Sequence, residues 1–514
     1  MEICVRYCQF FEHNTSLIPR VLENFVRLTH SDHVKIRRRS WYLFLRFVKP
    51  LRTHIGNVSQ AVIQAIGDLL TIKAELPDDS KDDDDMSSEN SEESADAVFN
   101  SQLYLFEAIG CISASPSVPL ENKILYTQSI LNPLFADMEK HMGLARNGDA
   151  RAVLQIHHDI QALGTLARGS SDWQPGVKAG STPPPSEVSG EFERAAEAIL
   201  LALESLSSSM DIRSAARFSF SRLLGVLGSR VLQQLPRWID GLLSQSSTKD
   251  EMATFLRLLD QVVFAFKGEI QDILDSLLAP LLQRVWAGLA EVSTGTDDEI
   301  QLHELGREYL NFLLIILNNG LEAVYVSSGK LSLNHETLCE ILLYIIPNIT
   351  PANQANFETI ITSLEHFIRD TKTPVDYSNA RLAISVLTRM TAVWGGPDIA
   401  PNTSAAPSPT LPGFDAFIIT RFSPLSWALP ATPGFKPRDP IGRAALEEVA
   451  ILQMEILKKT GARYLESLRG ELAAMGVQEE RVEEYLRALT GMGEKGFRRF
   501  FVEFVSPGKA EAGR

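Results

Sequence analysis

The spacing of apolar residues is the feature that most limits what this chain can fold into. Apolar residues recur at intervals of three and four along almost the whole sequence, which places them on one stripe of a helix. Early examples are Leu17, Leu22 and Phe25, then Trp41, Phe44 and Val48, then Val62 and Ile66. Strand-type alternation is hard to find, and no long heptad run occurs. The pattern predicts roughly twenty helices, stacked in pairs rather than wound into a coiled coil.

An internal repeat supports stacked pairs. Residues 36–46 and 212–222 share Ile, Arg, Phe and Arg at an offset of 176 positions, which is four periods of 44. That period lies within the ~40–47 residues of HEAT and armadillo units. A weaker third copy begins at Asn379. We therefore expect an all-α fold, an α-solenoid (superhelix) of HEAT-like helix pairs.

Three segments interrupt the helical pattern. Residues 76–96 hold ten acidic residues and one Lys, so we expect a disordered acidic loop. Residues 169–188 read as a flexible Gly/Ser/Pro loop, and residues 396–412 as a Pro-rich loop. The expected repeat regions and the tail are residues 1–75, 97–168, 189–395, 413–505 and 506–514.

The charge balance allows a nucleic-acid partner. The whole chain has a net charge of −15, but residues 76–96 carry −9 of it, so the remainder is only mildly acidic. No apolar run approaches the ~18–20 residues of a membrane helix, and we expect no membrane insertion and no secretory signal. Four scattered cysteines, Cys4, Cys8, Cys111 and Cys339, are typical of a reducing compartment.

No motif in the chain calls for catalysis. There is no phosphate-binding glycine loop, no dinucleotide fingerprint and no nucleophile elbow. Two thiols at Cys4 and Cys8 do not close a zinc site, and adjacent His157 and His158 point about 100° apart on a helix. The run of residues 82–85 is acidic but lacks fixed geometry. We expect no enzyme, no cofactor and no metal, and structural or solvated roles for these residues.

The strongest charge feature is residues 20–52, which hold nine basic and two acidic residues, a net charge of +7. If its basic side chains share an exposed face, they could pair with several phosphates. The candidates are Lys35, Arg37, Arg38, Arg39, Arg46 and Lys49. In the alternative interpretation, Arg37 and Asp32 bond neighbouring repeats and the others are simply solvated. Arg498 and Arg499 form a weaker second patch.

Residues 33–49 resemble a pattern of the exportin-T family, a Lys-Val-Arg-x-Arg run followed by Leu-Phe-x-Arg-Phe-Val-Lys. Residues 5–11, 387–396 and 497–504 are similar to other parts of that family. The resemblance spans nearly the whole chain apart from the three interruptions. The family is about twice as long, so this chain resembles its C-terminal half, without the N-terminal repeats that chiefly bind GTP-bound Ran.

The resemblance implies a tRNA nuclear export receptor that binds tRNA together with GTP-bound Ran, meets nuclear pore proteins and shuttles between nucleus and cytoplasm. Lys35, Arg37, Arg39, Arg46 and Lys49 match the family motif, and Arg38 lies beside them. The alternative is a HEAT-repeat scaffold, or a karyopherin for a protein cargo, with residues 76–96 as its interaction tail. As a further hypothesis, the acidic loop competes with RNA for the basic face.

Overall fold

The computed structural model describes residues 1–76, 95–177, 182–244, 247–293, 295–325, 351–371, 373–398 and 413–506. Throughout these residues every regular element is a helix, as the apolar spacing predicts. The chain divides into two compact units, Met1–Ser247 and Thr248–Arg514. Each unit is built from stacked helix pairs, the arrangement of an α-solenoid.

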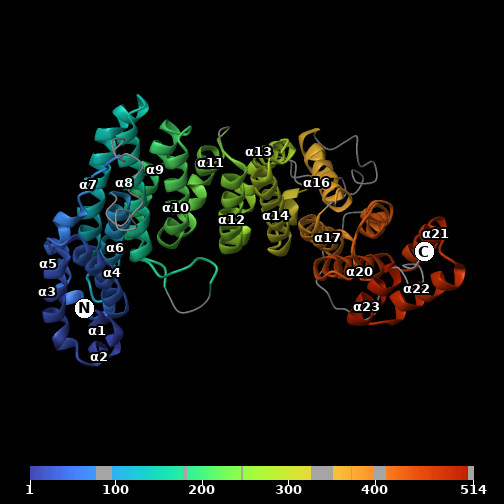
Figure 1. Ribbon diagram of the computed structural model, residues 1–514, viewed down its shortest axis with the longest axis horizontal. Helices are drawn as coiled ribbons and strands as arrows, with labels where there is room; N and C mark the ends of the chain where they lie inside the picture. Colours follow the sequence, from blue (N-terminus) through green and yellow to red (C-terminus); the bar gives the residue numbers. More distant parts are fainter. Residues whose placement is uncertain are drawn as a thin grey trace, which may run out of the picture. The chain divides into compact units, whose positions relative to one another are not determined.

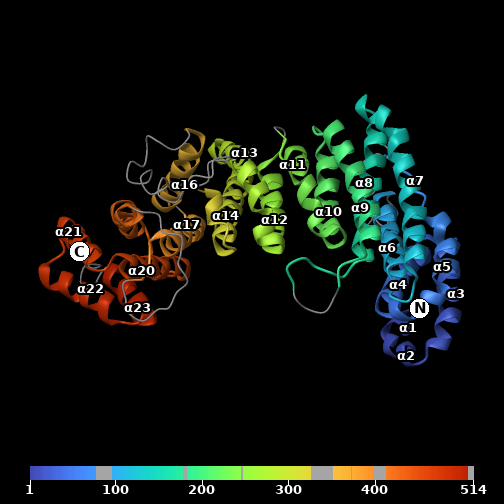
Figure 2. The same cartoon turned by 180° about the vertical axis from the view of Figure 1, so that it is seen from behind.

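The first unit has two rows of helices, blue to green in Figure 1 and seen from behind in Figure 2. In the first row each helix packs along the next: α4 (Val34–Leu51), α6 (Ala95–Ser113), α8 (Ala150–Ser170) and α10 (Met210–Leu227). The second row holds the partners of these helices: α3 (Ile18–Thr29), α5 (Ser59–Ile66), α7 (Leu120–Arg146), α9 (Ser186–Ser205) and α11 (Val231–Leu242). Two short helices, α1 (Glu2–Arg6) and α2 (Cys8–His13), pack on α4.

The second unit repeats this plan. Its first row is α12 (Lys249–Phe266), α14 (Thr296–Asn318), α17 (Pro374–Trp394), α20 (Pro440–Thr460) and α23 (Glu494–Val505), each packed on the next. Its other α-helices are α13 (Gln271–Ala290), α16 (Pro351–Arg369), α18 (Phe414–Phe417), α19 (Ala428–Ala431), α21 (Ala462–Ala474) and α22 (Glu479–Gly491).

Single turns of 3-10 or π helix join the longer elements. In the first unit they are η1 (Thr15–Leu17), η2 (Arg52–His54), η3 (Gly56–Val58), η4 (Gly67–Leu70) and η6 (Gly228–Arg230). In the second they are η7 (Lys267–Ile270), η8 (Glu322–Tyr325), η9 (Ile418–Phe422) and η10 (Ser423–Trp427). Such short turns keep consecutive helices antiparallel and adjacent.

The internal repeat is confirmed in three dimensions. Helices α4 and α10 are both 18 residues long and begin 176 positions apart. Arg37 Nη1 donates to the Ser31 carbonyl at 3.3 Å, and Arg213 Nη1 donates to the Ser207 carbonyl at 2.6 Å. Each arginine therefore bonds the backbone six residues before it, within its own repeat. The suggested third copy does not keep this register, because Arg381 is the eighth residue of α17 and not the fourth.

The buried face of α4 is the one that its apolar spacing predicts. Trp41 and Phe44 are 4% and 0% exposed. The Trp41 Nε1 donates to the Thr29 carbonyl of α3 at 3.0 Å, and Phe47 stacks on Phe25 with ring centroids 4.8 Å apart. A polar anchor and an aromatic stack thus fix the α3–α4 pair.

Glycines set the spacing of the first-row helices. A Cβ added to Gly110 of α6 would lie 2.5 Å from the Leu166 carbonyl oxygen and 2.8 Å from the Gly169 Cα of α8. On α8, a Cβ at Gly164 would lie 2.7 Å from the Ser219 Cα of α10. Side chains on neighbouring first-row helices can therefore reach one another over short distances.

Parts of the three expected interruptions lie outside the described residues, namely 77–94, 178–181 and 399–412. The described flanks extend the helices into the expected loops, because α6 begins at Ala95, α8 ends at Ser170 and α9 begins at Ser186. Asp398, before the third interruption, pairs with Lys459 at 2.9 Å and Lys458 at 3.2 Å, which lowers the pKa of its carboxyl. The expected acidic run 82–85 and Cys339 are among the residues not described.

One stretch, Lys249–Ala290, is apolar and long enough by length and composition alone to cross a membrane. It comprises α12, η7 and α13, joined at Lys267 with a φ of 46°. Helix α12 packs on α14 through fully buried side chains such as Phe255, Val262 and Val263. The apolar residues of α12 thus contribute to the core of the second unit.

Candidate nucleic-acid interface

Four of the six predicted basic residues of α4 lie on one exposed stripe. Lys35, Arg39, Arg46 and Lys49 follow one another at intervals of four, seven and three, which are whole turns of a helix. All four are exposed, and the buried Phe44 and Phe47 occupy the opposite side of the helix. The sequence therefore identified a continuous basic face.

Tyr42 lies in the middle of this stripe. The guanidinium carbon of Arg39 is 5.3 Å from the centre of its ring, and that of Arg46 is 6.0 Å from it. The ring also meets Tyr104 of α6 edge to face, with centroids 5.3 Å apart. Both cations are therefore held over a fixed aromatic surface rather than extended freely into water.

Carboxylates neutralise only part of the stripe. Arg39 Nη2 lies 2.8 Å from the Glu2 carboxylate, whose pKa is lowered by this hydrogen bond and charge. Both side chains are more than half exposed, so the pair is screened by water and salt, and a phosphate can replace this interaction. Arg46 forms no ion pair within the described part of the chain.

A second group of cations continues the stripe across the first row of helices. Lys49 Nζ lies 2.8 Å from Glu107 Oε1 of α6, and Arg168 Nε of α8 lies 3.7 Å from the same oxygen. The positive charge of Arg168 lowers the pKa of Arg222 on α10, and the negative charge of Glu107 raises it. One nearly buried carboxylate thus lies among three cations, which leaves an excess of positive charge.

Arg222 is held in an unusual way. Its guanidinium carbon lies 3.3 Å from the centre of the Phe218 ring, and Nη1 donates to the Phe218 carbonyl at 2.9 Å. Burial, together with the charge of Arg168, lowers the pKa of Arg222 to about 10. Its Nε is buried and meets no acceptor among the described residues. An anion placed beside the guanidinium of Arg222 would offset this positive potential.

We call the surface formed by these six residues the basic strip: Lys35, Arg39, Arg46, Lys49, Arg168 and Arg222. The sequence alone did not identify Arg168 and Arg222 as binding residues. No sequence pattern around Arg168 indicates a binding role, since only helix packing brings it and Lys49 to the same carboxylate of Glu107. A signal for Arg222 existed, because it is the repeat counterpart of Arg46 at the offset of 176.

The structure does not bring the other predicted residues onto this strip. Arg37 bonds the Ser31 carbonyl, and Arg38 Nε donates to Ser101 Oγ of α6 at 3.0 Å. Arg498 and Arg499 belong to α23 in the second unit, where Arg498 pairs with Glu494 and Arg499 is exposed.

The described cysteines and the histidine pair have structural surroundings. Burial raises the pKa of the Cys8 thiol to about 11 and that of Cys111 to about 12, which keeps both thiols protonated. His158 stacks on Phe99 with centroids 3.7 Å apart, and burial lowers its pKa to about 4. A search of the described residues finds no group of three or more His, Cys, Asp or Glu that could hold a metal ion.

Comparison with known protein families gives a consistent match. A family model described as Exportin-T matches residues 1–346 and 345–509. The exportin-T of Emericella nidulans is 56% identical over 510 residues, and that of Phaeosphaeria nodorum is 56% identical over 517 residues. Each alignment covers 98% of this chain and 47% of the relative. The chain thus spans about half the length of the curated relatives it matches.

Among solved structures, one described as Importin13 in its cytosolic state aligns with a TM-score of 0.59 at 12% identity. The alignment covers 98% of this chain and 48% of that one. At this identity the likeness concerns the fold alone, and it agrees with the α-solenoid predicted from the apolar spacing.

Proposed function

Because the chain belongs to the exportin-T family, we propose that it forms the tRNA-holding part of a nuclear transport receptor that exports tRNA. Its role in this proposal is binding and not catalysis. The basic strip is the surface that meets the RNA, and it reads the shape and charge of the folded backbone rather than a base sequence. Arg38, Arg37, Arg498 and Arg499 would add secondary contacts at most.

The observation that carries this proposal is the excess of positive charge across α4, α8 and α10. Glu2 pairs with Arg39 and Glu107 lies between Lys49 and Arg168, and the Glu2 pair is exposed and weak. Phosphate oxygens are the acceptors that arginine forks fit best. The ring-supported guanidinium of Arg46, which is exposed, suits such an acceptor.

The partners in this proposal are those of an export receptor. The RNA would bind together with GTP-bound Ran, each raising the affinity for the other. Nuclear pore proteins would meet the receptor as it shuttles between nucleus and cytoplasm. The main Ran contacts are expected in repeats beyond the span that this chain covers in its relatives, so the proposal for this chain concerns tRNA first.

The test compares two double variants with the same change in charge. Arg46→Glu with Arg168→Glu alters the basic strip, and Arg20→Glu with Arg27→Glu alters exposed positions on α3. Binding of labelled tRNA is followed by fluorescence anisotropy between ~50 and ~200 mM salt. The strip variant should lose at least ~10-fold in affinity and show a shallower salt dependence, by about one to two units of slope.

The α3 variant should lose no more than ~3-fold, since it changes the net charge but not the strip. Circular dichroism must show the same helix content for both variants. Equal losses for the two variants, or the absence of saturable tRNA binding by the unmodified chain at ~50 mM salt, would contradict the proposal.

A further inference from the structure

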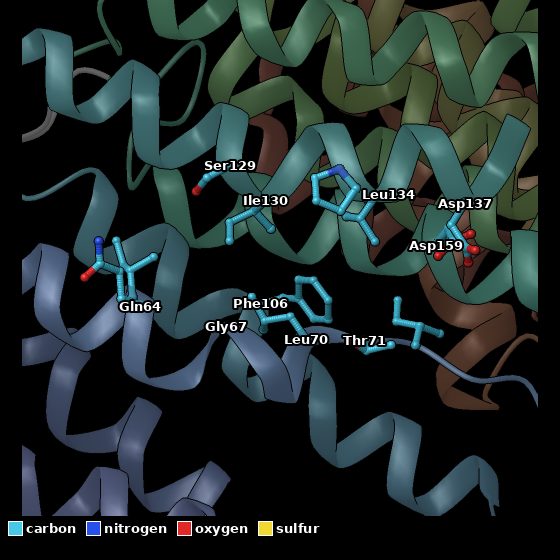
Figure 3. A pocket seen from close by; sticks show the side chains of 13 residues that line it. Gln64, Gly67, Leu70, Thr71, Phe106, Ser129, Ile130, Leu134, Asp137 and Asp159 are labelled. Atoms are coloured by element: carbon cyan, nitrogen blue, oxygen red, sulfur yellow. The ribbon is translucent and has the colours of Figure 1, made fainter.

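A cavity of about 490 Å³ opens in the first unit, and none of its lining residues belongs to the basic strip. It lies between α5 and η4 on one side and α7 on the other, with α6 and α8 behind it (Figure 3). Its walls are apolar along most of their length, and they include Ile63, Leu70, Phe106, Ile130 and Leu134. The cavity is therefore large enough for a long side chain with an aliphatic stem.

Two carboxylates, Asp137 of α7 and Asp159 of α8, lie together at one end of this cavity (Figure 3). Gln64 lies at the opposite end and is neutral. Asp159 is 0% exposed, and neither of its carboxylate oxygens meets a hydrogen-bond partner in the described structure. A buried carboxylate without a cation or a donor is costly, so this group requires an explanation.

Asp137 and Gln155 lie close enough to Asp159 for weak hydrogen bonding, which raises its pKa in the first case and lowers it in the second, but neither contact has good hydrogen-bond geometry. Gln155 Nε2 donates to Asp137 Oδ2 at 2.6 Å and to the Ile72 carbonyl at 3.2 Å, which fixes Asp137 at the cavity end. His141 Nδ1 lies 3.3 Å from Asp137 Oδ1, so this histidine also contacts Asp137 and not Asp159. Burial, together with the charge of Asp137, raises the pKa of Asp159 well above its usual range. Asp159 is therefore held mainly as the neutral acid, and a cation placed against the two carboxyl groups would favour the loss of this proton.

We propose that this cavity binds an arginine side chain of a partner peptide, with its guanidinium on Asp137 and Asp159. The aliphatic stem of arginine fits the apolar walls next to the two carboxyl groups. Guanidinium is more weakly hydrated than ammonium and has five donors in a plane, so it suits two buried carboxylates better than lysine does. This partner is additional to the proposed tRNA cargo.

The test uses the full chain and three small probes. N-acetyl-arginine methylamide, the matching citrulline compound and the matching lysine compound are titrated into the protein and followed by calorimetry. The arginine probe should bind at least ~10-fold more tightly than citrulline, which has nearly the same shape but no charge, and also more tightly than lysine. Equal affinity for arginine and citrulline, or no detectable binding of the arginine probe, would overturn the proposal.

Three variants separate this site from general charge effects. Asp159→Asn keeps the shape of the side chain and should reduce binding of the arginine probe at least ~10-fold. Gly67→Leu should also reduce it, because Gly67 lines the cavity and a Cβ there meets nothing within 4 Å. Glu139→Gln, an exposed change on the same helix as Asp137, should leave binding unchanged. A loss as large in Glu139→Gln as in Asp159→Asn would also overturn the proposal.

The readout is independent of tRNA. Asp159→Asn should keep the tRNA affinity of the unmodified chain, because the cavity and the basic strip share none of their residues. Failure of tRNA binding would thus leave the arginine site standing, and failure of the probe titration would leave the strip standing.

Discussion

Arg46 and Arg222 occupy the same position in two helices that begin 176 residues apart, and each places its guanidinium over the aromatic residue four positions before it. Tyr42 supports Arg46 at 6.0 Å, and Phe218 supports Arg222 at 3.3 Å. The same repeat position therefore presents an aromatic-supported cation twice along the first row of helices. This relationship makes the basic strip a property of the repeat and not of one helix.

Arg37 and Arg213, near the starts of α4 and α10, should contribute to the stability of the fold, whereas the arginines of the strip should contribute to RNA binding. Arg213 is 2% exposed and bonds the Ser207 carbonyl, so Arg213→Met should lower the free energy of unfolding by ~2–4 kcal/mol. Arg37 is less buried, and Arg37→Met should cost only ~1 kcal/mol. Urea denaturation followed by circular dichroism measures both. A larger loss for Arg37 than for Arg213 would contradict the assigned roles.

The Glu107 carboxylate partly neutralises the positive charge of the strip. Glu107→Gln should raise tRNA affinity by ~2–5-fold at low salt, because Lys49 and Arg168 lose their shared carboxylate. The same change should lower stability by ~1–2 kcal/mol, since it breaks a partly buried pair. Anisotropy titrations and urea denaturation provide the two readouts. Weaker RNA binding in this variant, with the fold intact, would count against the strip.

Close helix packing in the first row depends on small residues. Gly169→Ala should lower the free energy of unfolding by ~2–4 kcal/mol, because the new Cβ would overlap the Glu107 carbonyl of α6. Gly190→Ala on α9 is the matched control, since its Cβ meets nothing within 4 Å. That change should stabilise the protein by up to ~1 kcal/mol through helix propensity. Similar effects of the two substitutions would show that the packing is looser than described.

Asp260 should make the stability of the second unit depend on pH. Burial, with the charge of Glu308, raises the pKa of Asp260 to about 7 in the folded chain. The folded state thus retains a proton that the unfolded state releases above pH ~4, so this group lowers stability as pH rises from ~4 to ~7.

Asp260→Asn should remove that contribution. Its gain in thermal midpoint over the unmodified chain should grow between pH 5 and pH 7 and then level off, as measured by scanning calorimetry. The exposed Asp250→Asn on the same helix is the control, and its profile should run parallel to that of the unmodified chain. A gain for Asp260→Asn that does not change with pH would contradict the raised pKa.

Local sequence patterns were sufficient to predict the helical fold, the repeat and the exposed stripe of α4. The helical fold and the stripe depend on spacing within one helix, and Lys35, Arg39, Arg46 and Lys49 share a face for that reason alone. The repeat depends on the same residue types recurring 176 positions later. The alternative interpretation gave Arg37 a structural role together with Asp32 between neighbouring repeats, whereas Arg37 bonds the Ser31 carbonyl within its own repeat, because this bond depends on how the chain enters the helix.

Contacts between helices could not be predicted in the same way. Arg168 of α8 reaches Glu107 of α6, which is also the partner of Lys49, where Gly110 and Gly169 let α6 and α8 approach closely. The pair of Asp137 and Asp159 likewise depends on how α7 and α8 pack, and no motif in the sequence marks it.

The most direct test of the basic strip is photo-cross-linking of the full chain to tRNA that carries 4-thiouridine, followed by mass spectrometry of the cross-linked peptides. The account predicts cross-links in peptides from α4 and α10, with fewer when Arg46 and Arg168 are changed to glutamate. Cross-links confined to second-row helices such as α3 and α9, or unaffected by those two substitutions, would contradict it.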